Sequence, residues 1–312
     1  MAEKTESLKT PKKAATSRTR KLDYKSKKKS VKINEPIPSS FSILVLALKH
    51  IWRNKKLFIG ILIVYAVLYM ILVRGLAANF KLPDTKQAVE DAGGDLDVIT
   101  LGTVLFGSLV GTAGSTQSES AAVYQVLLFI LLSLVLIWAL RQTYATTAKI
   151  KVKQAFYSSM YPLIQYILVW ILISLQLLPA LIGISLYSIV SSNGIAVGTL
   201  ENILWIMLAI IFTSISIFFV SSSLFATYIV ALPNMTPMLA IKKASIIVKF
   251  RRFAVIRKVI FFPIFTSLFA LLIFLPLVVY LTFFAEIFFM VFLLALILVG
   301  HAYFYNLYRK LM

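Results

Sequence analysis

The sequence contains no cysteine and only two histidines, His50 and His301. Disulfide bonds, thiolate metal sites and a cysteine nucleophile are therefore excluded, and two histidines in different segments offer little for acid–base or metal chemistry. The motifs H-E-x-x-H and G-x-S-x-G and the nucleotide-binding Walker loop are also absent. Acidic residues are scarce, since 12 of them stand against 32 Lys and Arg. We therefore predict no catalytic residues, no cofactor site and no metal ligands.

Long apolar runs dominate the rest of the chain. Hydrophobic residues make up 60% of its 312 residues and charged residues only 14%, a composition too apolar for a water-soluble fold. A helix needs about 17 to 25 residues, most of them apolar, to cross a bilayer. Six blocks reach that length, and we predict an all-α polytopic membrane protein with six transmembrane helices. The predicted spans are about 57–73, 123–140, 162–190, 203–232, 259–280 and 287–305.

Lys and Arg are divided unevenly between the two ends of these spans. Of the 32, 29 lie within residues 1–56, in the links 141–153 and 242–258, and at the C-terminus. The links on the opposite side carry three cations and eight acidic residues. Short cationic links are retained in the cytoplasm, so we predict that both termini are cytoplasmic.

Residues 1–39 differ in composition from the rest. They are rich in Lys, Ser and Thr and contain one aromatic residue, Tyr24. Such a segment buries too little apolar surface to offset its ordering entropy. We therefore predict a disordered basic cytoplasmic tail over 1–39 and a transmembrane domain over 40–312, with an outer loop over 74–122. The net charge of +20 favours contact with anionic lipid, whereas a single aromatic residue for base stacking disfavours nucleic acid.

One further apolar segment, residues 98–113, is too short to span comfortably. It has 16 residues, of which three are glycine. Making it a span would also move the cationic link 141–153 to the outer side. We expect it to lie at the outer interface or to re-enter the membrane.

Cationic amphipathic stretches precede three pairs of spans, over residues 40–56, 148–162 and 237–258. We expect the first to form an interfacial helix over 41–55, capped by Ser40. Each stretch contains an alanine followed by a bulky apolar residue, at Ala47, Ala155 and Ala240. Two interpretations stay open: three copies of an interfacial helix plus a transmembrane hairpin, or the basic links that any polytopic protein places on its inner side.

The third of these links carries the candidate site. Thr236 can cap a helix, and Pro237 occupies the favoured first helical position. Apolar residues then follow at helical spacing with cations between them, which is typical of a helix lying on the inner leaflet. The same charges would also suit a loop that only sets topology. The candidate contacts to lipid or to a protein partner are Lys242, Lys243, Lys249, Arg251, Arg252, Arg257 and Lys258.

The stretch YIVALPNMTPMLAIKKASIIVKFRR, from Tyr228 to Arg252, resembles the signature of a group of bacterial six-span membrane proteins. In that group a span ends at a proline-containing turn, followed by an Ala–Leu pair, a serine and a basic patch. The group includes the membrane domain of some glycerophosphodiester phosphodiesterases. The resemblance implies a bacterial plasma membrane. It implies no catalytic residue, because the phosphodiesterase activity belongs to a separate soluble barrel that this sequence does not contain.

Polar residues inside the spans are few. The fourth span carries Thr213, Ser216, Ser223 and Thr227 at helical spacing. Such a stripe can line a path for a solute or let helices pack closely, and the lack of a partner charge favours packing. We therefore expect a non-enzymatic membrane protein that organises lipid, assists assembly or anchors a partner. A transporter or channel subunit is the alternative, and an enzyme with an unrecognised motif is a second one.

Overall fold

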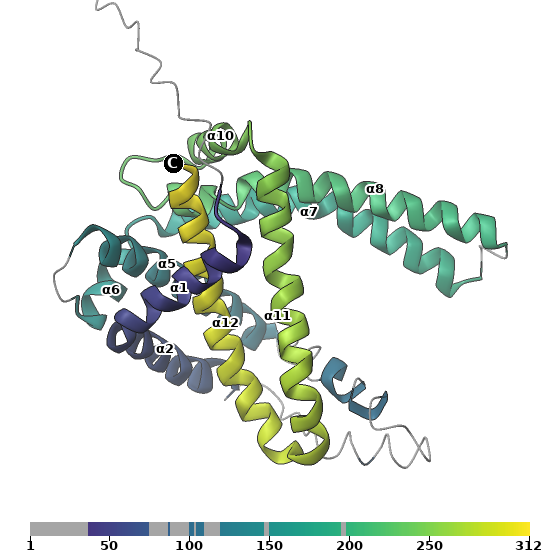
Figure 1. Ribbon diagram of the computed structural model, residues 1–312, viewed down its shortest axis with the longest axis horizontal. Coiled ribbons are helices and arrows are strands. Elements are labelled where there is room, and N and C mark those ends of the chain that lie inside the picture. The colour runs from purple at the N-terminus through teal and green to yellow at the C-terminus, as the bar shows by residue number, and fades with distance from the viewer. Residues whose placement is uncertain are drawn as a thin grey trace, which may run out of the picture. The chain divides into compact units, whose positions relative to one another are not determined.

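The computed structural model describes residues 37–74, 87, 100–102, 104–108, 119–146, 150–194 and 198–312. Most of the predicted tail and of the predicted outer loop lies outside these residues. The helices, shown in Figure 1, are α1 (Ser40–Arg53), α2 (Lys55–Tyr69), the π-helical turn η1 (Met70–Arg74), α5 (Glu119–Ala145), α6 (Val152–Ser159), α7 (Leu163–Ser192), α8 (Thr199–Ser223), α9 (Ala226–Ile229), α10 (Pro237–Val248), α11 (Arg252–Tyr280) and α12 (Thr282–Leu311).

Six helical segments of the described chain are long and apolar enough to cross a membrane. They are Lys55–Val73, Ser120–Ala145, Leu163–Ser192, Thr199–Ile229, Arg252–Tyr280 and Thr282–Leu311. Each contains most or all of one predicted span. The fold class predicted from the sequence is confirmed: the protein is an all-α polytopic membrane protein.

The first helix differs from its prediction at its start. Ser39, rather than Ser40, is the cap, and its Oγ accepts a hydrogen bond from the Ser42 backbone N–H at 3.2 Å. Ser40 is already the first helical residue. The two serines are adjacent and chemically equivalent as caps, so composition alone could not separate them.

The fourth predicted span is interrupted near the end predicted to be cytoplasmic. α8 ends at Ser223, and a turn at Leu224 and Phe225 separates it from the short helix α9. The hydroxyls of Ser221 and Ser222 donate to the carbonyls of Phe218 and Phe219, three residues back. Such bonds compete with the regular helical ladder and loosen it, which accounts for a break that hydropathy could not indicate.

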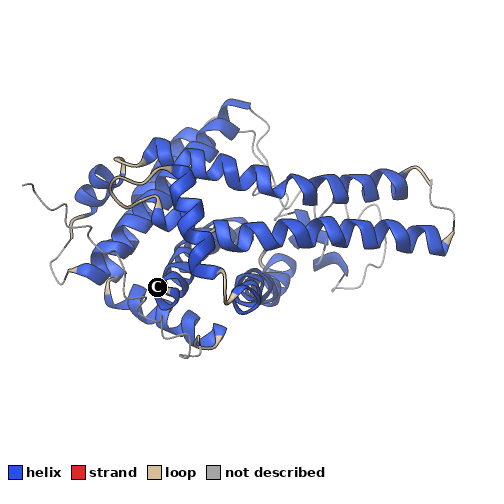
Figure 2. Ribbon diagram, turned by 90° about the horizontal axis from the view of Figure 1, so that it is seen from above, coloured by secondary structure: helices blue, strands red, loops and turns tan. Residues whose placement is uncertain are grey.

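The long helices α7 and α8 lie side by side along their lengths (Figures 1 and 2). Gly183 permits this approach, because a Cβ at that position would lie 2.8 Å from the Cβ of Phe212. The backbone N–H of Ala180, which follows the helix-interrupting Pro179, donates to Ser216 Oγ of α8 at 3.0 Å. The polar stripe of the fourth span therefore holds two helices together at Ser216, as the packing interpretation expects.

The short helices α1, α6 and α10 each precede a pair of long helices. The second and third of them pack on the pair that comes before them in sequence: α6 contacts α2 and α5, and α10 contacts α7, α8 and α9. α1 has no preceding pair and packs mainly on α12, with further contacts to α11. We call each short helix and the pair of long helices that follows it a unit. The first unit thus contacts the third, the second contacts the first, and the third contacts the second, and we call this closed cycle the three-unit ring. Ala47, Ala155 and Ala240 are all fully buried in these contacts, which favours the repeat interpretation.

The predicted outer segment 98–113 is described only at residues 100–102 and 104–108, which form helical turns. Leu101 and Leu105 are buried in a small cluster with residues of α11 and α12, among them Phe274 and Phe289. Phe289 lies near the start of α12, at the opposite end of that helix from the C-terminus. The described part of the segment thus packs at the end of the α11–α12 pair predicted to be external.

Candidate lipid-contact surface and the tyrosine hub

α10 begins as the sequence predicts. Thr236 Oγ1 accepts a hydrogen bond from the Leu239 N–H at 3.4 Å, and Pro237 is the first helical residue. The buried side of the helix is a ridge of small residues at four-residue spacing, Ala240, Ala244 and Val248. The ridge fixes which side of α10 faces outward, and that outward side carries the cations.

The outward side of α10 and the first turns of α11 mix cations with large apolar side chains. Lys242, Lys243, Lys249 and Arg257 are exposed. The exposed apolar residues among them are Met238, Ile246, Phe250 and Phe253, with exposed fractions of 71%, 61%, 79% and 89%. We call these eight residues the α10–α11 surface. An exposed apolar patch of this kind marks a site of contact with a membrane or another protein.

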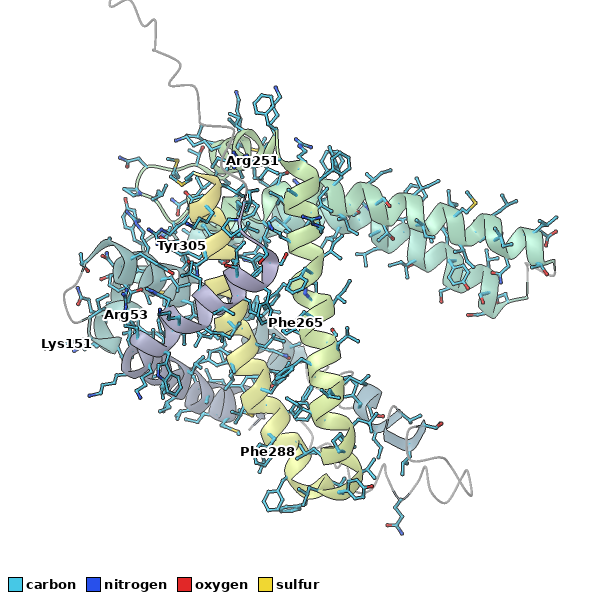
Figure 3. All side chains as sticks on the ribbon, in the orientation of Figure 1. Arg53, Lys151, Arg251, Phe265, Phe288 and Tyr305 are labelled. Atoms are coloured by element: carbon cyan, nitrogen blue, oxygen red, sulfur yellow. The ribbon has the colours of Figure 1, made fainter. Side chains whose placement is uncertain are left out.

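Arg251 and Arg252 are only partly exposed. Arg252 donates from Nη2 to Ser245 Oγ at 3.3 Å, and its guanidinium lies 4.4 Å from the ring centroid of Phe218. It thus ties the turn after α10 to α8. Figure 3 labels Arg251 at this turn. Both arginines border the α10–α11 surface, and the contacts of Arg252 also hold its position.

Lys258 lies away from this surface. Its side chain is 2% exposed, and Nζ donates to the backbone carbonyl of Pro38 at 2.7 Å. The hydroxyl of Tyr303 donates to the carbonyl of Lys258 at 3.0 Å. Lys258 therefore links the residues before α1 to α11 and α12, and we leave it out of the lipid-contact set.

A second cluster, which the sequence did not reveal, lies where the second helix of each pair ends. We call Tyr144, Tyr228, Tyr305 and Tyr308 the tyrosine hub. The ring centroids of Tyr144 and Tyr228 lie 5.6 Å and 5.8 Å from that of Tyr305, and Tyr308 lies 6.1 Å from both Tyr228 and Tyr305. The hub thus joins the three units of the ring through aromatic contacts.

Hydrogen bonds and stacking order the hub. The Tyr144 hydroxyl donates to Asn306 Oδ1 at 2.6 Å. His50 of α1 stacks on Tyr144, with ring centroids 3.8 Å apart, and its Nε2 lies 2.9 Å from Thr143 Oγ1. Burial is the main cause that lowers the pKa of His50 to about 4, followed by the charges of Arg53 and Arg309. His50 is therefore neutral at physiological pH.

Three arginines from three helices surround the hub. The guanidinium of Arg309 lies 4.0 Å from the Tyr144 ring centroid. Arg141 donates from Nη1 to the carbonyl of Ala231 at 3.1 Å. Arg53 ends α1, one helical turn after the His50 that stacks on Tyr144, and Figure 3 labels it at that end of the helix. All three belong to segments that are far apart in sequence.

One sequence signal could have pointed to the hub. Thr143-Tyr144 and Thr227-Tyr228 are identical dipeptides, and each closes the second span of its pair. Each also stands shortly before an alanine of the repeat pattern, Ala155 or Ala240. The dipeptide therefore belongs to the same repeat as the alanines. His50 and the arginines have no such signature.

The described residues contain no group of three or more His, Asp or Glu side chains that could hold a metal ion. No family model matches the sequence, and no curated protein or solved structure matches it either. The candidate sites are therefore judged on their own geometry, which offers exposed cations, exposed aromatic rings and a buried hub.

Proposed function

We propose that this protein is a non-enzymatic component of the bacterial plasma membrane that holds anionic lipids of the inner leaflet at the α10–α11 surface. The observation that carries the proposal is the mixture of exposed cations with exposed Phe250 and Phe253 on one surface. A protein surface binds an anionic leaflet when its aromatic rings enter the headgroup boundary and its cations meet the lipid phosphates. An acidic soluble protein would not require the two phenylalanines.

The charge distribution supports the orientation in this proposal. Of the acidic residues whose side chains are described, Glu201 lies at the start of α8 and Glu286 at the start of α12. The α10–α11 surface lies at the other ends of these helix pairs. Both termini are then cytoplasmic, in agreement with the retention of cationic links.

The test is a charge-neutral variant of the three exposed lysines, Lys242→Gln, Lys243→Gln and Lys249→Gln. Each Lys near an anionic leaflet contributes about 1 kcal/mol, so the triple change should weaken binding roughly 100-fold at low salt. The readout is the ratio of phosphatidylglycerol to phosphatidylcholine that the purified protein retains from a mixed bilayer. Wild-type preference should also decline as salt is added.

The matched control removes three exposed cations elsewhere on the same side, Lys151→Gln, Lys153→Gln and Lys310→Gln. It should leave the ratio close to that of the wild type. Insertion in the wild-type orientation has to be verified for both variants, because these charges also set topology. Equal loss in both variants would reduce the proposal to a general effect of net charge.

The transporter alternative makes the opposite prediction. Replacing Ser216 and Ser223 with Ala should leave lipid retention unchanged if the α10–α11 surface does the work. A pathway through the fourth span would instead make these serines essential and the lysines dispensable. Retention of one soluble protein in place of lipid would favour partner anchoring.

A further inference from the structure

Three arginines from three helices lie around the Tyr144 ring. Arg309 lies against that ring, and Arg53 follows, by one helical turn of α1, the His50 that stacks on it. Arg141 precedes Tyr144 by one helical turn of α5. The described acidic side chains, Glu201 and Glu286, are at the opposite ends of their helices. These two acidic side chains therefore do not pair with the three arginines, two of which, Arg53 and Arg309, are exposed.

The side chains of the hub supply no negative charge. His50 is neutral, and the tyrosine hydroxyls are uncharged at physiological pH. Three positive charges with no acidic side chain of the described residues between them attract an anion, less strongly as salt is added.

The chemistry of arginine indicates which anion fits. A guanidinium has five N–H donors in a rigid plane that matches the oxygens of a phosphate, and the bond from Arg141 to Ala231 uses one of its five. Stacking on Tyr144 holds the plane of Arg309 in place. Carboxylates and phosphates both accept such bonds, but a phosphate offers enough oxygens for three arginines.

We propose that Arg53, Arg141 and Arg309 form a binding site for one phosphate group at the tyrosine hub, separate from the α10–α11 surface. The phosphate belongs either to the headgroup of an inner-leaflet lipid or to a soluble phosphate compound. Because α1, α5 and α12 each contribute one arginine, the bound phosphate joins the first and third units of the three-unit ring. Occupancy then stabilises the closed ring.

The experiment uses the full chain in neutral detergent. Inorganic phosphate is titrated against sodium chloride of equal ionic strength while the thermal unfolding midpoint is recorded, and retained phosphatidylglycerol or phosphatidic acid is counted by native mass spectrometry. Arg309→Gln and Arg53→Gln are the variants of choice, because both side chains are exposed. Arg141 is left unchanged, because its hydrogen bond to the carbonyl of Ala231 also holds the fold together. Lys310→Gln is the control, since it removes an exposed neighbouring cation.

Each arginine variant should lose about tenfold in affinity, corresponding to one charge-assisted hydrogen bond, while the control keeps wild-type affinity. Arg309→Lys retains the charge without the planar group and should give an intermediate loss. Stabilisation by inorganic phosphate identifies a soluble ligand. Retention of one tightly held anionic lipid, reduced in the arginine variants, identifies a headgroup.

If the arginine variants and Lys310→Gln behave alike in both assays, the site does not exist. The triple lysine variant of α10 separates this result from the proposed function. It should weaken general lipid preference and leave the single high-affinity phosphate at the hub unchanged.

Discussion

The imidazole of His50 lies flat against the phenol ring of Tyr144, with the two planes 6° from parallel. His50 comes from α1 and Tyr144 from the end of α5, so this stack joins the interfacial helix of the first unit to the second long helix of the same unit. His50 is 5% exposed, and its burial has a consequence for the pH dependence of stability.

The first prediction is that acid destabilises the protein through His50. The pKa of His50 falls from 6.5 to about 4, chiefly because of burial and then because of Arg53 and Arg309. Between these values the unfolded chain binds a proton that the folded protein does not, so stability is complete above pH 6.5 and is lost as the pH falls toward about 4. Thermal unfolding midpoints in detergent should show this decline. The phenol of Tyr144 and both arginines keep the same charge over this pH interval, so they do not contribute to it.

His50→Gln is the matched variant, because glutamine retains hydrogen-bonding capacity and does not titrate. It should lower stability at neutral pH and flatten the decline over that interval. Parallel curves for the two proteins would assign the acid sensitivity to other groups.

A second prediction concerns the close approach of α7 and α8. Gly183→Leu places side-chain atoms where Phe212 and Ala209 already lie, at 2.8 Å and 3.3 Å from an added Cβ. Overpacking of this kind costs about 1–3 kcal/mol, so the unfolding midpoint should fall. Gly107→Leu serves as the control, because nothing lies within 4 Å of an added Cβ there. Equal stability of the two variants would show that the two helices can separate freely.

A third prediction follows from the bond between Ala180 and Ser216. Ser216→Ala leaves the Ala180 N–H without its partner inside the α7–α8 contact, and interhelical bonds of this kind contribute about 0.6–2 kcal/mol. Ser214→Ala is the control, since Ser214 is exposed and bonds only within its own helix, to the carbonyl of Ile210. The first variant should unfold at lower temperature than the second. The reverse order would remove the structural role assigned to Ser216.

Orientation gives a fourth prediction. Reporters placed after Lys151, after Arg252 and after Met312 should all lie in the cytoplasm, because 29 of the 32 cations lie in segments predicted to be on that side. A reporter in the turn at Gly194, between α7 and α8, should lie outside. The same side for Lys151 and Gly194 would disprove the six-span topology.

The neighbours Arg257 and Lys258 provide a fifth prediction. Lys258→Ala removes the bond to Pro38, and hydrogen bonds to charged groups contribute about 1.5–3 kcal/mol. We therefore expect a lower unfolding midpoint and easier proteolysis around residues 37–39. Arg257→Ala should change neither measurement, because its side chain is exposed. Similar behaviour of the two variants would mean that the Lys258 bond carries no net stability.

Composition was sufficient to predict the six spans, because a membrane helix leaves a run of apolar residues that no other element requires. The start of α10 was equally predictable, since Thr236 and Pro237 have local roles. Both features depend on neighbours in sequence. Neither requires knowledge of which helices touch.

The inward position of Lys258 could not be predicted, because it depends on where α11 begins. The fifth span was expected to begin near residue 259, whereas α11 begins at Arg252. Lys258 is therefore part of α11, and it lies on the buried side of that helix with Val255 and Phe262. The tyrosine hub was missed because its members come from α5, α9 and α12, and the repeated Thr–Tyr dipeptide does not by itself show that these residues touch.

The closure of the three-unit ring sets an order on biosynthesis. α1 is made first, yet the surface that buries Ile43, Leu44 and Ala47 is supplied mainly by α12, which is made last. During translation this apolar side of α1 has only lipid or a chaperone to cover it. Chains that stop before α11 therefore leave α1 uncovered, and a quality-control protease can recognise them by that feature.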